Sequence, residues 1–244
     1  MDIRSATILP AKREAIELHT KDGLKLIGEL AVPEGSIAGT LVTFHPLPTH
    51  GGYMDSHVYK KASFRLPALA NIAVLRFNTR GTCSPAGCSE GKFDGGNAEK
   101  YDVDAAIEFA RSRGLPNIWV VGWSFGTELT LKYAMQDDVQ GAILLSPPLR
   151  TVTDEHMKDW AADGRPVKVL VPEYDDFLQP PEAKRRFLSL TQANVIGVPK
   201  AKHLWVGEKQ ASYVLNQIVE SVNPDAIGLP KTWEGDYATE KLPK

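Results

Sequence analysis

One serine lies in a setting that favours nucleophilic chemistry. Ser124 occupies the centre of Gly122-Trp-Ser-Phe-Gly126, which follows an apolar, β-branched run over residues 118–121 and precedes good helix formers. A sharp strand-to-helix turn of this kind raises the serine Oγ above the sheet and directs the Phe125 N–H towards an attacked carbonyl. The pattern predicts a nucleophile. The alternative that it leaves open is a serine that caps a helix after a buried strand.

A serine hydroxyl needs a base to take its proton, and the base needs an acid to hold its tautomer. The chain supplies Asp175 and His203, each after an expected strand, at residues 167–171 and 193–198. Both residues therefore become candidates for the same site as the serine. Asp176 is adjacent to Asp175 and stays open as the alternative acid, and a carboxylate that caps a loop is the alternative for either.

The elements that must position these groups alternate along the chain. Residues 15–20 and 24–32 predict a hairpin. Further strands are expected at 40–44, 72–77, 118–121, 139–145, 167–171 and 193–198, and helices at 56–70, 98–113, 153–162, 181–190 and 210–222. We expect Pro67 to bend or end its helix. This order predicts an α/β fold, with a mainly parallel twisted sheet, an antiparallel N-terminal hairpin and helices on both faces.

In such a sheet, reactive groups lie on loops at the carboxyl ends of the strands, where all three candidates fall. Residues 1–222 are interpreted as a single domain, and residues 223–244 as an irregular C-terminal tail that is draped or disordered. About 20 residues between the strands at 139–145 and 167–171 leave room for one short helix, so we expect a minimal lid.

Taken together, these motifs resemble the α/β-hydrolase superfamily, within its small bacterial members related to dienelactone hydrolase. The resemblance runs from about residue 14 to residue 222, and it rests on residues 45–52, 76–81 and 122–126, on the Asp175 loop and on His203. It implies the α/β-hydrolase fold, a catalytic triad of Ser124, Asp175 and His203, and an oxyanion hole built partly from the loop after Phe44. Dienelactone hydrolases themselves use a cysteine nucleophile, whereas position 124 is serine.

The second oxyanion donor can be narrowed by chemistry. Pro46 and Pro48 have no N–H, so the Leu47 N–H is the candidate to pair with that of Phe125. Other residues near these motifs are candidates for a substrate pocket: His45, His50 and Trp123. A metal site made of His45, His50 and His57 is disfavoured, because their spacing fits no common ligand pattern.

Arg76 and Arg80 flank the start of a long polar loop, residues 78–96. Salt bridges that anchor this loop are the favoured interpretation, and binding of a substrate carboxylate is the alternative. Cys83 and Cys88 lie in the same loop and are expected to be reduced thiols, with a small local disulfide as the alternative.

Composition limits the partners. The formal net charge is -2 over 244 residues, which gives no electrostatic basis for binding nucleic acid or an anionic membrane. Residues 1–5 lack a signal-peptide pattern, and no apolar run approaches the length of a membrane span, so a cytoplasmic location is expected. The oligomeric state is not predicted.

The resulting hypothesis is a serine hydrolase that cleaves carboxylic esters or thioesters of small acyl groups through an acyl-enzyme, without a cofactor or metal. A minimal lid leaves little apolar wall, which favours acetyl to butyryl groups, although the loop at 78–96 could fold over the site and supply one. The alternatives are a peptidase or amidase of the same fold, and a non-catalytic binding protein of that fold.

Overall fold

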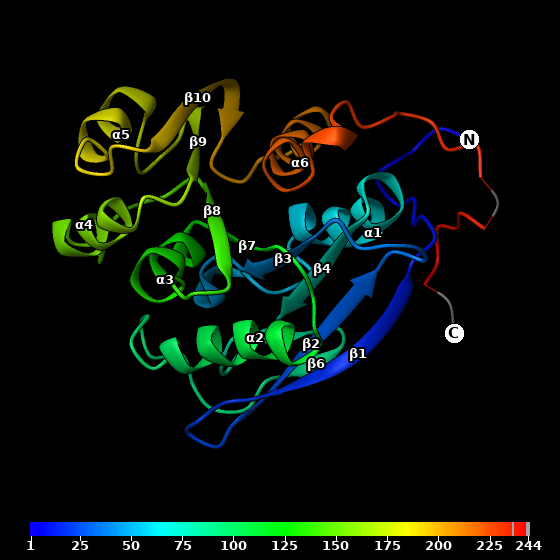
Figure 1. The fold of residues 1–244 in the computed structure, drawn as a ribbon, viewed down its shortest axis with the longest axis horizontal. Helices are drawn as coiled ribbons and strands as arrows, with labels where there is room; N and C mark the ends of the chain where they lie inside the picture. Colours follow the sequence, from blue (N-terminus) through cyan, green and yellow to red (C-terminus); the bar gives the residue numbers. More distant parts are fainter. Residues whose placement is uncertain (236, 243–244) are drawn as a thin grey trace.

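The protein is built around one mixed sheet. In the computed structural model, which describes residues 1–235 and 237–242, eight strands form this sheet in the order β1-β2-β4-β3-β7-β8-β9-β10 (Figure 1). The strands are β1 (Lys12–His19), β2 (Lys25–Val32), β3 (Gly39–Phe44), β4 (Ile72–Phe77), β7 (Ile118–Trp123), β8 (Val139–Leu145), β9 (Val167–Tyr174) and β10 (Ala193–Lys202). β1 and β2 run antiparallel to their neighbours, whereas β4, β3 and β7–β10 pair in parallel. The predicted fold class is confirmed.

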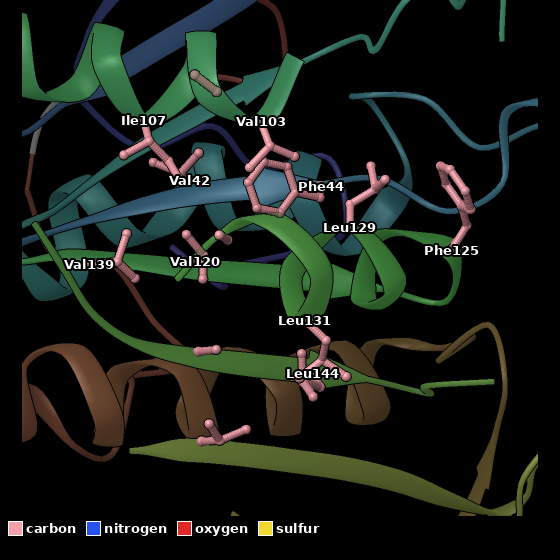
Figure 2. Close-up of a cluster of buried hydrophobic side chains, with 14 of the residues drawn as sticks. Val42, Phe44, Val103, Ile107, Val120, Phe125, Leu129, Leu131, Val139 and Leu144 are labelled. Carbon is pink, nitrogen blue, oxygen red and sulfur yellow. The ribbon is translucent and has the colours of Figure 1, made fainter. Parts of the chain in front are cut away.

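Helices cover both faces of the sheet (Figure 1). The helices are α1 (His57–Ala70), α2 (Lys100–Ser112), α3 (Phe125–Tyr133), α4 (Asp154–Asp163), α5 (Pro180–Arg186) and α6 (Glu208–Val222). Side chains of α1 and α6 pack in one hydrophobic cluster, and those of α2, α3, α4 and α5 in another. Figure 2 shows part of the second cluster, where Val103 and Ile107 of α2 meet Val42 and Phe44 of β3. The helix predicted at 98–113 is therefore present as α2, and it packs against the sheet through these residues.

Pro67 does not end its helix. α1 continues to Ala70, where Asn71 closes it in a left-handed conformation with φ 52°. Proline lacks the N–H that would bond the carbonyl four residues earlier. That carbonyl, of Ser63, instead accepts a hydrogen bond from Arg13 Nη2 at 2.9 Å. The tertiary contact replaces the missing helical bond, which local sequence cannot reveal.

Two strands extend further than their apolar runs. β9 continues to Tyr174 and β10 to Lys202, so each ends immediately before a predicted site residue. The added residues include exposed positions, because both strands lie towards one edge of the sheet. The helix between these two strands, α5, ends at Arg186, whereas the sequence predicts its end at residue 190.

The loop at residues 78–96 contains the short strands β5 (Cys83–Ser84) and β6 (Gly87–Cys88), which were not predicted. Their antiparallel pairing sets Cys83 opposite Cys88, with Cα atoms 4.0 Å apart, and a disulfide joins them. The expectation of two reduced thiols is wrong. Strands of two residues are too short to show a hydrophobic pattern, so the sequence could not reveal that the thiols face each other.

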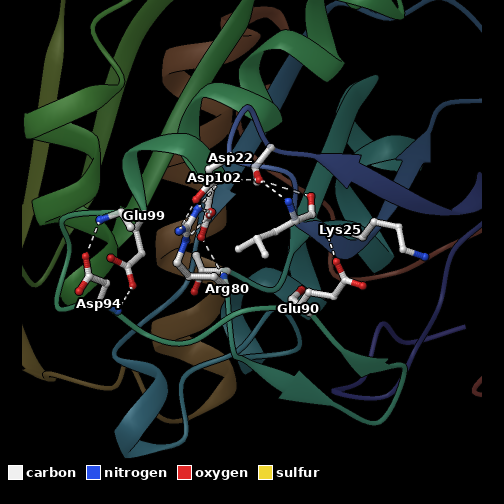
Figure 3. Close-up of polar contacts among 12 residues, drawn as sticks. Asp22, Lys25, Arg80, Glu90, Asp94, Glu99 and Asp102 are labelled. Carbon is white, nitrogen blue, oxygen red and sulfur yellow. Dashed lines mark hydrogen bonds and ion pairs between the residues drawn. The ribbon is translucent and has the colours of Figure 1, made fainter.

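Ion pairs and capping bonds fix this loop to the sheet and to α2 (Figure 3). Arg80 donates from its backbone N–H and from Nε to Asp102, at 2.8 and 2.9 Å, and from Nη1 to Asp22 at 2.8 Å. Burial lowers the pKa of Arg80, but the hydrogen bonds to Asp22 and Asp102 outweigh burial and hold that pKa above its usual value. The anchoring role predicted for Arg80 is confirmed.

Arg76 has a different position from the one predicted. Its guanidinium pairs with Glu29 of β2, at 2.9 Å from Nη2 to Oε1, and with Asp55 before α1. Arg76 therefore ties β4 to β2 and to the start of α1, and the loop at residues 78–96 is held without it. The reason is strand alternation, which sends the Arg76 side chain away from the loop that follows its strand.

Part of the C-terminal tail lies along the N-terminal segment (Figure 1). Isolated bridges pair Asp2 with Thr232 and Ile8 with Thr239. The tail is thus draped at these positions, while the prediction for residues 236 and 243–244 lies outside the described residues. Among the described helices, none is long and apolar enough to cross a membrane.

Candidate active site

Ser124 stands on a strained turn between β7 and α3. Its φ is 53° and its ψ is -116°, a backbone conformation that non-glycine residues adopt at a cost of about 1–3 kcal/mol. Two close approaches enforce the turn. A Cβ on Gly126 would lie 1.9 Å from the Phe44 carbonyl oxygen, and one on Gly122 would lie 2.4 Å from the Gly126 oxygen. The glycines of the motif are therefore required by packing.

The three predicted residues meet in one chain of hydrogen bonds. The Ser124 Oγ lies 2.8 Å from His203 Nε2, and His203 Nδ1 lies 2.9 Å from Asp175 Oδ2. We assign the imidazole proton to Nδ1, where the carboxylate accepts it, which leaves Nε2 free to accept the serine hydroxyl. This arrangement can draw a proton from Ser124.

Asp175, and not Asp176, is the carboxylate in contact with His203. Asp175 is 4% exposed, and its second oxygen accepts the N–H groups of Phe177 at 2.9 Å and Leu178 at 3.2 Å. Asp176 is exposed beside the cavity. The two neighbouring carboxylates thus have distinct surroundings, which the sequence left open.

The backbone that carries His203 is itself held in place. Its carbonyl accepts hydrogen bonds from Trp123 Nε1 at 3.1 Å and from Ser146 Oγ at 3.0 Å. The carbonyl of Leu204 accepts from His57 Nε2 at 2.7 Å, and the His57 ring packs edge-on against Trp123. Sequence reasoning missed Ser146 and His57 as supports, because neither lies near His203 in the chain.

The predicted oxyanion donors lie at the cavity with Ser124. Leu47 precedes a short 3-10 helix at Pro48–His50, and both Leu47 and Phe125 line the cavity. Within the described chain, neither backbone N–H donates to a protein acceptor. Gly52 packs against this turn, since a Cβ there would lie 2.0 Å from the Pro46 oxygen and 2.9 Å from the Leu47 nitrogen. Two residues with free backbone N–H groups thus line the same cavity as the serine.

A cavity of about 550 Å³ opens at Ser124 and His203. Its walls are largely apolar and come from several loops: Pro46, Leu47, Phe93, Phe125, Pro148, Phe177 and Leu204. Phe93 belongs to the loop at residues 78–96 and packs edge-on against Phe125, with ring centres 5.3 Å apart. That loop therefore supplies an apolar wall, the possibility that the sequence left open. Residues 146–166, all of them described, hold α4 and no lid domain.

Three residues, His45, His50 and Trp123, are predicted to line a substrate pocket, and two of them lie outside the cavity. His50 lines the cavity, whereas His45 and Trp123 are buried and do not. Trp123 belongs to the hydrophobic cluster under α1 and α6, because its side chain leaves β7 on that face. This position explains why its indole supports the His203 backbone and does not contact the cavity.

His45 is buried at the start of the loop that follows Phe44. Its Nδ1 lies 2.7 Å from the Pro46 carbonyl oxygen, and its Nε2 accepts the Thr79 N–H at 3.0 Å. Burial lowers the pKa of His45 to about 4, so the ring is neutral at pH 7. No group of three or more metal-ligating side chains that could hold an ion occurs among residues 1–235 and 237–242.

No protein-family model matches the chain. An uncharacterized protein of Rickettsia prowazekii (strain Madrid E) is 30% identical over 135 residues, which cover 49% of this chain and 54% of that protein. The match thus spans about half the length of this curated relative.

Solved structures match over most of the chain. An α/β serine hydrolase without a lid from Xanthomonas campestris is 26% identical, with a TM-score of 0.72 over 92% of this chain and 99% of that one. An α-beta serine hydrolase homologue from Coxiella burnetii is 22% identical, with a TM-score of 0.70 over 86% and 97%. An esterase from Pyrococcus furiosus is 15% identical, with a TM-score of 0.70 over 86% and 90%. The last two are likenesses of fold alone.

Proposed function

We propose that the chain, which belongs to the α/β-hydrolase superfamily, is a hydrolase that cleaves carboxylic esters or thioesters through an acyl-enzyme. The observation that carries the proposal is the hydrogen-bonded chain from Ser124 through His203 to Asp175, at 2.8 and 2.9 Å. In this proposal Ser124 is the nucleophile, His203 is the general base and acid, and Asp175 orients His203.

The first half of the reaction forms the acyl-enzyme. Ser124 Oγ bonds to the substrate carbonyl carbon while its proton passes to His203 Nε2, and the carbonyl oxygen becomes an oxyanion. When that oxyanion collapses, the carbon–oxygen or carbon–sulfur bond breaks. The leaving alkoxide or thiolate takes the proton from His203 Nε2 and departs as the alcohol or thiol.

The second half releases the acid. A water molecule gives a proton to His203 Nε2 as its oxygen attacks the acyl carbon. Collapse of this second oxyanion breaks the bond to Ser124 Oγ, which recovers its proton from His203. Asp175 stays ionised throughout and stabilises the imidazolium that forms in each half.

In the proposed mechanism, the oxyanion lies next to the N–H groups of Leu47 and Phe125. Such donors act strongly when they are fixed before the reaction, because no reorganisation is then needed. Pro46 and Pro48 restrict the backbone on either side of the Leu47 N–H, and the start of α3 fixes the Phe125 N–H. Removal of a single donor of this type costs roughly 10²–10³ in kcat.

Esters and thioesters are favoured over amides on chemical grounds and by the esterase of similar fold. The cavity offers apolar walls for an acyl or alcohol group. The free donors at Leu47 and Phe125 favour catalysis over the alternative of a binding-only protein, which would not need them.

The test is hydrolysis of 4-nitrophenyl acetate and butyrate and of an acyl thioester by the purified full chain. We expect turnover by the natural sequence and a loss on the order of 10⁶ in kcat for Ser124→Ala, with unchanged urea unfolding. A panel of matched anilides serves as the control for amidase activity. Turnover that survives in Ser124→Ala, or a preference for the anilides, contradicts the proposal.

A further inference from the structure

One arginine that lines the cavity, Arg150, has a guanidinium without an acidic partner among the described residues. Arg150 lies on the loop between β8 and α4 and lines the same cavity as Ser124 and His203. Among the described residues, its guanidinium makes neither an ion pair nor a hydrogen bond. Arg80 and Arg165, by contrast, each hold at least one carboxylate. An unpaired guanidinium in a cavity with apolar walls is a candidate ligand-binding group.

The backbone around Arg150 is built to hold it there. Glu128 of α3 is 3% exposed, and its carboxylate accepts the Arg150 N–H at 2.7 Å and the Thr151 N–H at 2.7 Å. The preceding carbonyl, of Leu149, accepts a hydrogen bond from Arg186 Nη2 at 2.9 Å. Glu128 therefore uses its charge on the loop backbone and leaves the Arg150 side chain free.

Aromatic stacking directs the guanidinium. The Arg150 guanidinium carbon lies 4.7 Å from the centre of the Phe177 ring. The same ring packs edge-on against the His203 ring, with ring centres 4.6 Å apart. An arginine stacked on a ring keeps the N–H groups at its edge available for a planar anion. This contact joins the exposed Arg150 side chain to the loop that follows Asp175, on the same cavity as Ser124 and His203.

Asp176 is the opposing charge. Its exposed carboxylate lines the same cavity on the residue next to Phe177. Glu128 also lines the cavity, where the backbone N–H groups of Arg150 and Thr151 hold its carboxylate. One arginine with two carboxylates nearby offers too little positive charge for a phosphate dianion. A carboxylate carries a single charge and matches the two parallel donors of one guanidinium. The ligand that fits best is therefore a carboxylate.

We infer that Arg150 binds a carboxylate group on the substrate, so that the preferred esters are monoanionic. This inference rests on the proposed ester hydrolysis and specifies its substrate class. The carboxylate belongs to the acyl part, as in a dicarboxylic acid monoester, or to the alcohol part, as in an acyloxybenzoate. In both cases the charge distinguishes the true substrate from a neutral ester of the same size.

The experiment compares kcat/KM within two matched pairs of esters. One pair is 4-nitrophenyl hydrogen glutarate and its methyl ester, and the other is 4-acetoxybenzoate and its methyl ester. We expect the natural sequence to prefer the anionic member of one pair by about tenfold, the effect of a charge-assisted hydrogen bond. Arg150→Gln should bring that ratio close to one, Arg150→Glu should invert it, and Asp176→Asn should raise it. Arg185→Gln is the control, since Arg185 pairs with Glu182 away from the cavity.

Two results overturn the inference while the proposed function stands: neutral and anionic esters hydrolysed equally well, or a ratio that Arg150→Gln leaves unchanged. If no ester is hydrolysed, the proposed function fails, and calorimetric binding decides the role of Arg150. Glutarate and 4-hydroxybenzoate are then titrated into Ser124→Ala and into the same chain with Arg150→Gln. Binding lost with Arg150 supports the inference, and absence of binding to Ser124→Ala contradicts it.

Discussion

At the scale of single residues, the site depends on small differences between neighbours. Asp175 and Asp176 are identical side chains, yet one is buried against His203 and the other is exposed. The two N–H groups that hold Asp175 come from the turn that follows β9, so the turn selects which carboxylate meets the imidazole. A sequence pattern could narrow the acid to this pair but could not choose between them by chemistry alone.

The first prediction separates these carboxylates. Asp175→Asn should lower kcat by roughly 10⁴, because the amide favours the wrong imidazole tautomer. Asp176→Asn should change kcat for a neutral ester by far less, because its side chain has no contact with His203. Steady-state rates with 4-nitrophenyl butyrate are the measurement. The reverse ranking of the two variants would contradict the assignment of the acid.

The second prediction uses the buried His45. Its pKa is about 4 in the folded protein and about 6.5 when unfolded, so between these values the unfolded chain binds more protons. Stability from this residue is therefore fully present above pH 6.5 and is lost as the pH falls towards 4, by on the order of 3 kcal/mol. In His45→Gln, urea unfolding should show a smaller difference between pH 7.5 and pH 4.5 than the natural sequence shows. An equal difference in both chains would mean that His45 titrates normally.

At the scale of elements, the catalytic loops are supported by contacts that no local pattern displays. The sequence predicts the strands, the turn at Ser124 and the loop that carries His203, because apolar runs and glycines mark them. It predicts neither the role of Trp123 and Ser146 at the His203 carbonyl nor the pairing of Cys83 with Cys88. These contacts depend on which side of a strand a residue faces and on how distant loops meet.

The third prediction concerns that support. Trp123→Phe combined with Ser146→Ala removes both donors to the His203 carbonyl while it keeps an aromatic ring in the core. We expect kcat to fall on the order of tenfold with KM nearly unchanged, because the base is misplaced while the cavity is intact. Steady-state kinetics and the pH dependence of kcat are the measurements, and each single variant is a control. A pure rise in KM would indicate that these residues shape the cavity instead.

At the scale of the whole molecule, the protein combines a short connection between β8 and β9 with a walled cavity. The segment between β8 and β9 holds the short helix α4, so the entrance has no lid domain. The wall that a lid would provide comes in part from the loop at residues 78–96, which Arg80 and Glu99 hold to α2. The sequence predicts the missing lid from chain length, but it could not place Phe93 of this loop beside Phe125.

The fourth prediction follows from this shape. Across neutral 4-nitrophenyl esters from C2 to C16, kcat/KM should reach its maximum below C10, because the cavity of about 550 Å³ is limited by fixed walls. Rates should rise smoothly through the solubility limit of the substrate, since no lid opens at an interface. A maximum at C10 or beyond, or a jump in rate when aggregates form, would show that a further apolar surface takes part.

The central claim is that Ser124 is the group that becomes acylated. The most direct measurement is reaction of the full chain with a fluorophosphonate, followed by mass spectrometry of the digested protein. The claim predicts one phosphonyl group per chain, located on Ser124, and no adduct on Ser124→Ala or on chain unfolded in urea. Absence of an adduct on the folded natural sequence, or an adduct on another residue, would contradict it.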